Sequence, residues 1–449
     1  MSELSHSQIR IGLLHLYYKN IPIYNLSFEL NLDGEIDLIL LEKSLNFLLY
    51  RFPQLKTNIK LINDKLVKCF SDDKIKVTII DNSNIENNHR EIHNFNNIYL
   101  DIEKEILIKV LYLKNINKLL FLFSDILIDG TTIITYFKNL ENIYNTLLYK
   151  KSLSLKKPSI NPVNVISDMT LNFWKDNINK DCITYLKVKN NDDTFLENRI
   201  RFSIEKDDFI LLKNKITKSS TTLFNFLTAK FLLFLRSLSN QENITIDTVI
   251  GNLETDDIGL FNNTVLIPYN FKNSMENTLD EYIQDCSKKL NIIKKNVVSL
   301  EYLSNKLDLE SLPNIRIHFE YANKNIDKHI FLGKSKLSSN GIENTANTIR
   351  QLLIFNVCEF DNKLECYFSY RKSAFDEPYI KKLIDIFKKF IFNDSAILIK
   401  NILKKTYDSN FDGVKYKSII DKRLISYKLA GKYPNIFYSD FKKQLDKLM

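Results

Sequence analysis

The stretch ILIKVLYLKNINKLLFLFSDILIDGTT, residues 106–132, decides how this chain folds. It contains two β-rich runs that are separated by a polar turn at residues 115–118. The second run has almost no polar residue, which predicts a central strand buried on both faces. It leads directly into SDILIDGTT and then into a helical pattern over residues 133–149. Because α/β sheets place their chemistry where a central strand ends in a polar loop before a helix, we expect a functional site in this loop.

Strands and helices alternate on both sides of this stretch. Upstream, the pattern predicts a strand at 25–32, a helix at 35–51 and a hairpin at 55–70 that turns at Asn63 and Asp64. Downstream, a polar segment with Pro158 and Pro162 resembles a linker. The second half then repeats the alternation, with expected strands and helices at 199–206, 221–238, 243–252, 315–323, 352–360, 363–370 and 379–392.

Two halves of similar construction follow from this order. The 449 residues, of which 44% are hydrophobic, suffice for one large core or two smaller ones, and the usual domain size favours two. The sequence predicts an N-terminal α/β sandwich over residues 1–165 and a C-terminal one over 166–404. Residues 405–449 form a lysine- and tyrosine-rich tail that we expect to be a capping or docking element.

Composition excludes several classes of function. The net charge of +9 is spread along the chain, without the concentrated basic stripe that nucleic-acid binding requires. The five cysteines are scattered and contain no CxxC pair, so we expect no structural metal. Neither a membrane-spanning apolar run nor an apolar signal core is present, which predicts a cytoplasmic protein without membrane partners. There is also no glycine-rich phosphate loop, so use of ATP is not expected.

The order and spacing of several segments resemble the condensation domains of nonribosomal peptide synthetases. SHSQIRIGLLHL at 5–16 is similar to the opening motif of that superfamily, and residues 24–57 are similar to its next block. SDILIDG at 124–130 lies where the family carries HHxxxDG, and IGLFNNTVLIP at 258–268 resembles IGxFVNT. The resemblance covers about residues 5–403. It implies two chloramphenicol-acetyltransferase-like halves in a V-shaped pseudo-dimer, with a central tunnel that admits two phosphopantetheine arms.

The resemblance also implies which residues form the site. The family's second histidine, which positions or deprotonates the attacking amine, corresponds to Asp125, and the first corresponds to Ser124. Asp129 and Gly130 retain the rest of the motif: the aspartate is mainly structural in the family, where it pairs with an arginine, and the glycine lets the backbone turn. Arg51 or Lys56 is the expected partner of Asp129. Residues flanking the motif or expected along the channel are Thr131, Thr132, Asn262, Asn263 and Thr264.

The replacement of histidine by Asp125 leaves several functions open. A carboxylate is a feeble base at pH 7, but burial raises its pKa and would make it usable. It would otherwise hold an ammonium nucleophile. The favoured hypothesis is a freestanding acyltransferase that joins an acyl or aminoacyl group on an acyl or peptidyl carrier protein to a small amine or hydroxyl acceptor. It would bind no cofactor of its own apart from the carrier's phosphopantetheine arm.

Three alternatives remain at this point. The first is a catalytically degenerate module that recruits a carrier protein or tailoring enzyme. The second is heterocyclisation, whose DxxxxDxxS pattern is matched imperfectly by Asp125, Asp129 and Thr132. The third is an acyltransferase that uses soluble coenzyme A.

Overall fold

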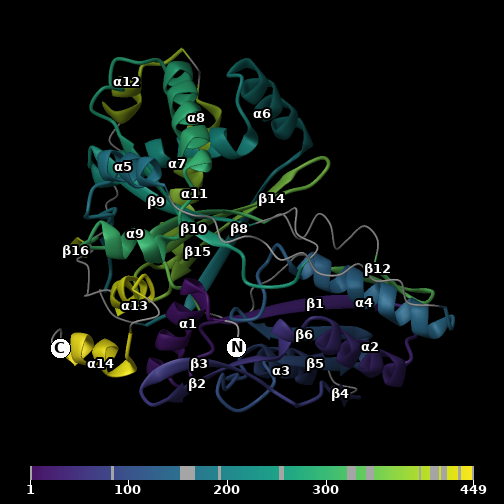
Figure 1. The fold of residues 1–449 in the computed structure, drawn as a ribbon. Helices are drawn as coiled ribbons and strands as arrows, with labels where there is room; N and C mark the ends of the chain where they lie inside the picture. Colours follow the sequence, from purple (N-terminus) through teal and green to yellow (C-terminus); the bar gives the residue numbers. More distant parts are fainter. Residues whose placement is uncertain are drawn as a thin grey trace.

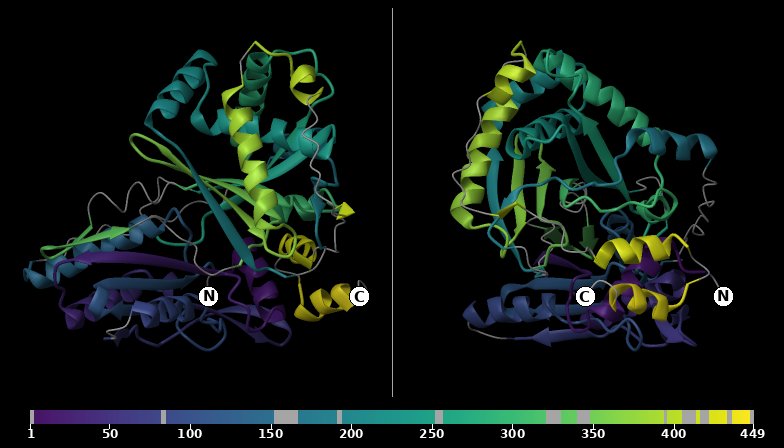
Figure 2. Two further views of the ribbon diagram at one scale, coloured as in Figure 1. Left: turned by 180° about the vertical axis from the view of Figure 1, so that it is seen from behind. Right: turned by 90° about the vertical axis from the view of Figure 1, so that its left-hand side faces the viewer.

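The computed structural model describes residues 3–81, 85–151, 167–190, 194–251, 257–320, 330–339, 348–393, 396–404, 414–415, 422–432 and 436–446. Two six-stranded sheets, each with its own helices, form two lobes (Figure 1). The lobes diverge from a shared contact region (Figure 2), which confirms the predicted α/β pair. The linker expected around Pro158 and Pro162 lies outside the described residues.

The N-terminal sheet has the order β12-β13-β1-β6-β5-β4. Its central strand is β6, which is flanked by β1 and β5 and is buried along nearly its whole length, as the apolar run predicted. The helices α2 and α4 pack against each other beside the sheet (Figure 1). The strands are β1 (Asn25–Asp33), β4 (Val77–Ile80), β5 (Ile108–Leu113), β6 (Lys118–Ser124), β12 (Ile330–Leu332) and β13 (Ser335–Ser339), and the helices of this lobe are α1 (His6–Tyr17), α2 (Leu38–Arg51), α3 (Ile85–Asn96) and α4 (Ile133–Leu148).

The predicted hairpin is confirmed beside this sheet. Strand β2 (Thr57–Ile62) pairs with β3 (Lys65–Phe70) in antiparallel register. Asn63 and Asp64 form the turn with φ of 49° and 64°, as tight hairpin turns require.

The C-terminal sheet has the order β10-β9-β11-β14-β15-β8. Its core is rich in aromatic rings, which join α7 and α11 to the sheet: Phe231 lies 5.4 Å from Phe355 and 5.6 Å from Phe387 between ring centroids. The strands are β8 (Glu197–Ile204), β9 (Asn243–Ile250), β10 (Asn263–Asn270), β11 (Ile315–Phe319), β14 (Leu353–Glu359) and β15 (Leu364–Arg371), and the helices are α5 (Asp168–Asn177), α6 (Lys206–Lys218), α7 (Leu223–Ser239), α8 (Leu279–Lys295), α9 (Leu300–Lys306), α11 (Glu377–Phe392) and α12 (Ile399–Lys404).

One hairpin crosses between the halves. Strands β12 and β13 follow β11 in the chain, yet β13 pairs with β1 at the edge of the N-terminal sheet. The hairpin covers an edge that would otherwise present unpaired backbone groups. Residues 330–339, predicted to belong to the second half, therefore complete the first sheet, because strand pairing is a long-range property that periodicity does not show.

The tail forms two helices, α13 (Lys422–Ala430) and α14 (Tyr438–Asp446). Helix α13 packs against α1 of one lobe and α9 of the other (Figure 1). Ile425 and Leu429 join the apolar core of the N-terminal lobe, whereas Tyr427 joins the apolar cluster around α9. Helix α14 is attached to the hairpin turn, where the backbone nitrogen of Tyr438 donates to the carbonyl of Asp64 at 2.8 Å.

Candidate functional site

The SDILIDG turn lies where the two lobes meet. It follows the central strand β6 and precedes α4, as the sequence predicted. Asp129, only 3% exposed, is the residue that holds the turn together. Its Oδ1 accepts hydrogen bonds from the backbone nitrogens of Thr131 and Thr132, each at 2.9 Å, and from the Thr131 hydroxyl at 2.6 Å.

The second carboxylate oxygen of Asp129 reaches the other lobe. Oδ2 accepts from the backbone nitrogen of Phe261 at 2.7 Å and of Asn262 at 2.9 Å. Both donors belong to the IGLFNNT loop before β10, so one buried carboxylate joins the two loops that the sequence singled out. Its five donors satisfy it without a cation, because N–H groups are effective partners of a carboxylate.

Further contacts fasten the same loops. The Thr132 hydroxyl donates to the Gly259 carbonyl at 2.7 Å, and the backbone nitrogen of Asp129 donates to that carbonyl at 3.2 Å. Gln54 donates to the Asp257 carboxylate at 2.6 Å and to the Ile258 carbonyl at 2.8 Å. The turn is thus fixed against the C-terminal lobe at several points.

The prediction that Arg51 or Lys56 pairs with Asp129 was wrong. Lys56 pairs instead with Asp72, at 3.5 Å between Nζ and Oδ1, and the Arg51 guanidinium lies over the ring of Phe52, 5.2 Å from its centroid. The backbone donors of the two loops occupy the carboxylate that Arg51 or Lys56 was expected to neutralise.

Asp125 has a different environment. Its backbone nitrogen donates to the carbonyl of Tyr24 at 2.8 Å, which fixes its place beside the start of β1. Its Oδ2 forms an ion pair with Nη2 of Arg350 at 3.3 Å, and its side chain is 16% exposed. No other described hydrogen bond reaches this carboxylate, so it is held by a single partner from the opposite lobe.

Charges around Asp125 act on its pKa in opposite directions. Burial raises the pKa above its ordinary value, and the nearby Arg350 and Arg10 counteract part of that rise. Arg350 also lies over the ring of Tyr24, 5.0 Å from its centroid. Burial raises the pKa of Tyr24, whose hydroxyl has no hydrogen-bond partner among the described residues.

Two buried ion pairs surround this centre. Arg10 of α1 pairs with Glu301 of α9 at 2.7 Å, which links the lobes, and both side chains are under 10% exposed. Arg316 of β11 pairs with Asp247 of β9, and its Nη2 lies 3.2 Å from Oδ2. Removal of one partner from such a pair strongly destabilises the fold, because the other charge is then buried and unpaired.

The remaining predicted site residues occupy distinct positions. Gly130 has open space beside it: a Cβ added there would meet no atom within 4 Å, and its φ is not positive. Ser124 is buried at the end of β6, and its hydroxyl accepts a bond of 3.4 Å from the Ile126 nitrogen. Asn263 and Thr264 begin β10, where they pair with β9.

The sequence did not predict a role for Arg350, Glu301 or Gly251. Arg350 and Glu301 are single charged residues whose partners lie more than 200 positions away, so no local pattern marks them. A Cβ on Gly251 would lie 2.1 Å from Cγ2 of Thr131, so the glycine permits the close approach of the lobes. Its place directly after a strand, in TVIGN, is the one signal the sequence offers.

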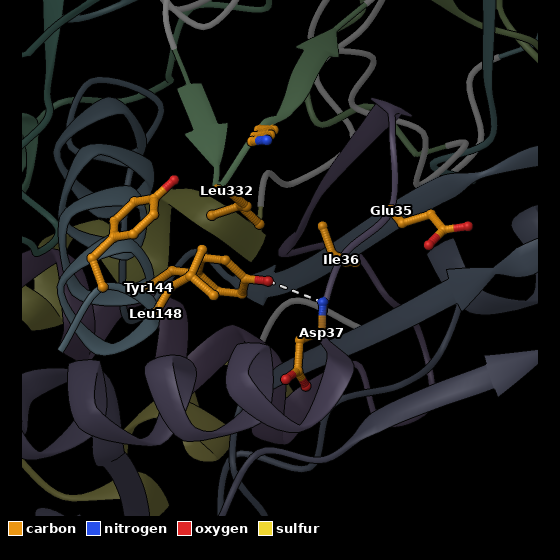
Figure 3. A pocket seen from close by; sticks show the side chains of 9 residues that line it. Glu35, Ile36, Asp37, Tyr144, Leu148 and Leu332 are labelled. Atoms are coloured by element: carbon orange, nitrogen blue, oxygen red, sulfur yellow. Dashed lines mark hydrogen bonds between the residues drawn. The ribbon is translucent and has the colours of Figure 1, made fainter.

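A cavity of about 550 Å³ lies elsewhere in the N-terminal lobe. Its walls come from the start of α2, the end of α4 and the β12–β13 turn, and the Tyr144 hydroxyl accepts a bond of 2.9 Å from the Asp37 nitrogen (Figure 3). Asp125 lies beside one end of β1 and the cavity beside the other, roughly 25 Å away for a strand of that length. The cavity is therefore separate from the Asp125 centre.

The described part of the chain contains neither a metal-binding cluster nor a membrane-spanning helix. No group of three or more histidine, cysteine, aspartate or glutamate side chains there has an arrangement that would hold a metal ion. None of the described helices is both long and apolar enough to cross a bilayer.

The paired lobes and the turn at their junction define a chloramphenicol-acetyltransferase-like pseudo-dimer. A sequence model of the condensation domain matches residues 1–396, and the chain belongs to that family. It is 24% identical over 332 residues to bacitracin synthase 2 of Bacillus licheniformis, a match that covers 68% of this chain and 12% of that protein. The chain therefore spans a small part of this relative's length.

Solved structures agree on the fold. The X-domain from teicoplanin biosynthesis has a TM-score of 0.72 at 13% identity, over 92% of this chain and 96% of that one. A variant of the starter condensation domain of rhizomide synthetase, in complex with C8-CoA, has a TM-score of 0.69 at 13% identity, over 89% and 96%.

Proposed function

We propose that this chain is a condensation-type acyltransferase in nonribosomal peptide or related natural-product biosynthesis. It transfers an acyl or aminoacyl group from the phosphopantetheine thioester of a carrier protein to an amine or hydroxyl acceptor. Membership of the condensation family supports the reaction class. The observation that carries the proposal is the position of Asp125, a partly exposed carboxylate at the lobe junction, beside a turn that Asp129 holds rigid.

Acyl transfer to an amine or hydroxyl requires a proton acceptor near the nucleophile. The acceptor nitrogen or oxygen attacks the thioester carbonyl carbon, a C–N or C–O bond forms, and the C–S bond breaks. The nucleophile loses a proton, and the departing thiolate gains one. A carboxylate whose pKa is raised by burial is a stronger base than an exposed aspartate, so Asp125 is suited to take that proton.

The substrate path would run past Gly130. An added Cβ at this glycine would meet no atom within 4 Å, which leaves room beside it for a tethered substrate. We propose that the phosphopantetheine arm of a partner carrier protein enters a passage between the lobes.

One observation favours a second function. Arg350 already occupies Oδ2 of Asp125, and a carboxylate engaged in an ion pair is less available to accept a proton. The second candidate is therefore a non-catalytic module that recruits a carrier protein or a tailoring enzyme.

Product formation separates the two functions. A carrier protein would be loaded with a panel of acyl and aminoacyl groups and mixed with the chain and a panel of amines, with product detected by mass spectrometry. We expect product with the wild type and a loss of about 100-fold or more with Asp125→Asn, the usual scale of a general base.

Four outcomes oppose this expectation. Carrier binding without product from any pair supports recruitment. Product from acyl-coenzyme A alone supports a coenzyme A-dependent enzyme, and a product that has lost water in a ring-forming step supports heterocyclisation. Equal product from the wild type and Asp125→Asn removes Asp125 from the mechanism.

A further inference from the structure

The C-terminal helix α13 is built into the junction of the lobes. It lies beyond residue 396, where the match to the family ends. Its side chains enter the apolar clusters of both lobes, and a Cβ on Gly431, directly after the helix, would lie 2.3 Å from the Glu301 carbonyl. The end of α13 therefore packs closely against Glu301, the residue of α9 that pairs with Arg10.

Two contacts connect α13 with the centre. Nη1 of Arg423 donates to the backbone carbonyl of Arg350 at 3.0 Å, and Nη2 of Arg371 donates to the same carbonyl at 2.7 Å. The Tyr427 ring receives the Arg10 guanidinium 4.6 Å from its centroid. The backbone of Arg350 is thus held by one residue of α13 and by one residue of β15.

Arg350 completes the link to Asp125. With its carbonyl held by two guanidinium groups, its side chain extends over Tyr24 and meets Asp125 at 3.3 Å. A long side chain loses considerable entropy when it adopts one conformation, so a fixed backbone makes that geometry easier to maintain. The sequence of contacts runs from Arg423 to Arg350 to Asp125.

We propose that α13 is part of the functional site and that Arg423 is a positioning residue, which keeps Arg350 against the carboxylate of Asp125. The inference rests on the proposed role of Asp125, but its first test needs no turnover.

Several charged and titratable groups surround Asp125, and the test must detect a change in its pKa when one of them moves. They are Arg350, Arg10 from α1, Arg316 from β11, Asp129 in the same turn, and Tyr24. Arg350 and Arg10 lower the pKa of Asp125, whereas burial and Asp129 raise it. If Arg350 withdraws, the pKa of Asp125 must rise further, and less of it is ionised at a given pH.

The experiment is a carboxyl NMR titration of the full chain with ¹³C-labelled aspartate, in which Asp125→Asn assigns the signal. We expect an upward shift of the Asp125 midpoint in Arg350→Met and a smaller upward shift in Arg423→Met. Arg423→Lys, which keeps a donor and the charge, should return the midpoint toward the wild type.

Lys428→Met is the matched control. It removes the ion pair between Lys428 of α13 and Asp308, in which Nζ lies 2.6 Å from Oδ1. The contact of Arg423 with Arg350 stays in place. Its midpoint should equal that of the wild type. Urea unfolding of each variant would confirm that the titrated protein is folded.

The outcomes separate the claims. An unchanged Asp125 midpoint in folded Arg423→Met, or an equal shift in Lys428→Met, overturns the role of Arg423. If the midpoints shift as expected while the wild type forms no product from any loaded carrier, the proposed acyl transfer fails and the positioning role of α13 stands. In an active enzyme, the acid limb of the pH–rate profile should shift in the same order as the midpoints.

Discussion

Asp125 and Asp129 lie four positions apart in one turn, yet the protein uses them differently. Asp129 is buried and receives five hydrogen bonds, two of them from the opposite lobe. Asp125 is partly exposed and meets one arginine at 3.3 Å. A carboxylate that is satisfied on both oxygens maintains the junction, whereas one that is bonded on a single oxygen can still meet a substrate.

The largest effect is expected at Asp129. Asp129→Ala leaves several buried N–H groups without an acceptor, and we expect a loss of about 3–5 kcal/mol in the free energy of unfolding, measured with urea. Asp37→Ala is the matched control: this exposed aspartate caps α2 through one bond of 3.0 Å, so its removal should cost about 1 kcal/mol. Similar losses for the two variants would contradict the structural role of Asp129.

A smaller effect is expected from Gly251→Ala. The added Cβ would press on Thr131, whose hydroxyl is bonded to Asp129 and therefore does not rotate away freely. Overpacking of this kind costs about 1–3 kcal/mol in the free energy of unfolding. Gly130→Ala in the same turn should change it by less than about 0.5 kcal/mol, because its Cβ meets no atom. Equal destabilisation by both alanines would show that the lobes do not meet at Gly251 as described.

An effect on stability smaller than that of Gly251→Ala is expected at Asp125. Asp125→Asn removes a partly exposed ion pair and also a charge whose burial is unfavourable, so the free energy of unfolding should change by less than about 1 kcal/mol. Because burial raises the pKa of Asp125, ionisation of this group lowers stability as the pH rises through that pKa. Asp125→Asn should therefore remove a small decline in stability that lies between the ordinary pKa of an aspartate and the raised pKa of Asp125. A loss comparable with that of Asp129→Ala would make Asp125 structural.

Local patterns predicted much of this molecule. The apolar run before Ser124 identified the central strand, and the polar segment after it identified the turn that lies at the lobe junction, because burial on both faces and helix initiation leave local signatures. The partner of Asp129 was predicted wrongly, since backbone donors carry no residue-type signal. Arg350, the β12–β13 hairpin and α13 were not placed, because each acquires its position through contacts with residues far away in the chain.

The most direct test compares turnover per folded molecule in Asp125→Asn and Asp129→Asn, with the folded fraction of each measured by urea unfolding under assay conditions. We predict that Asp125→Asn stays folded and loses turnover, whereas the activity of Asp129→Asn follows its folded fraction. Full turnover per folded molecule in Asp125→Asn would contradict the assignment of Asp125 as the functional carboxylate.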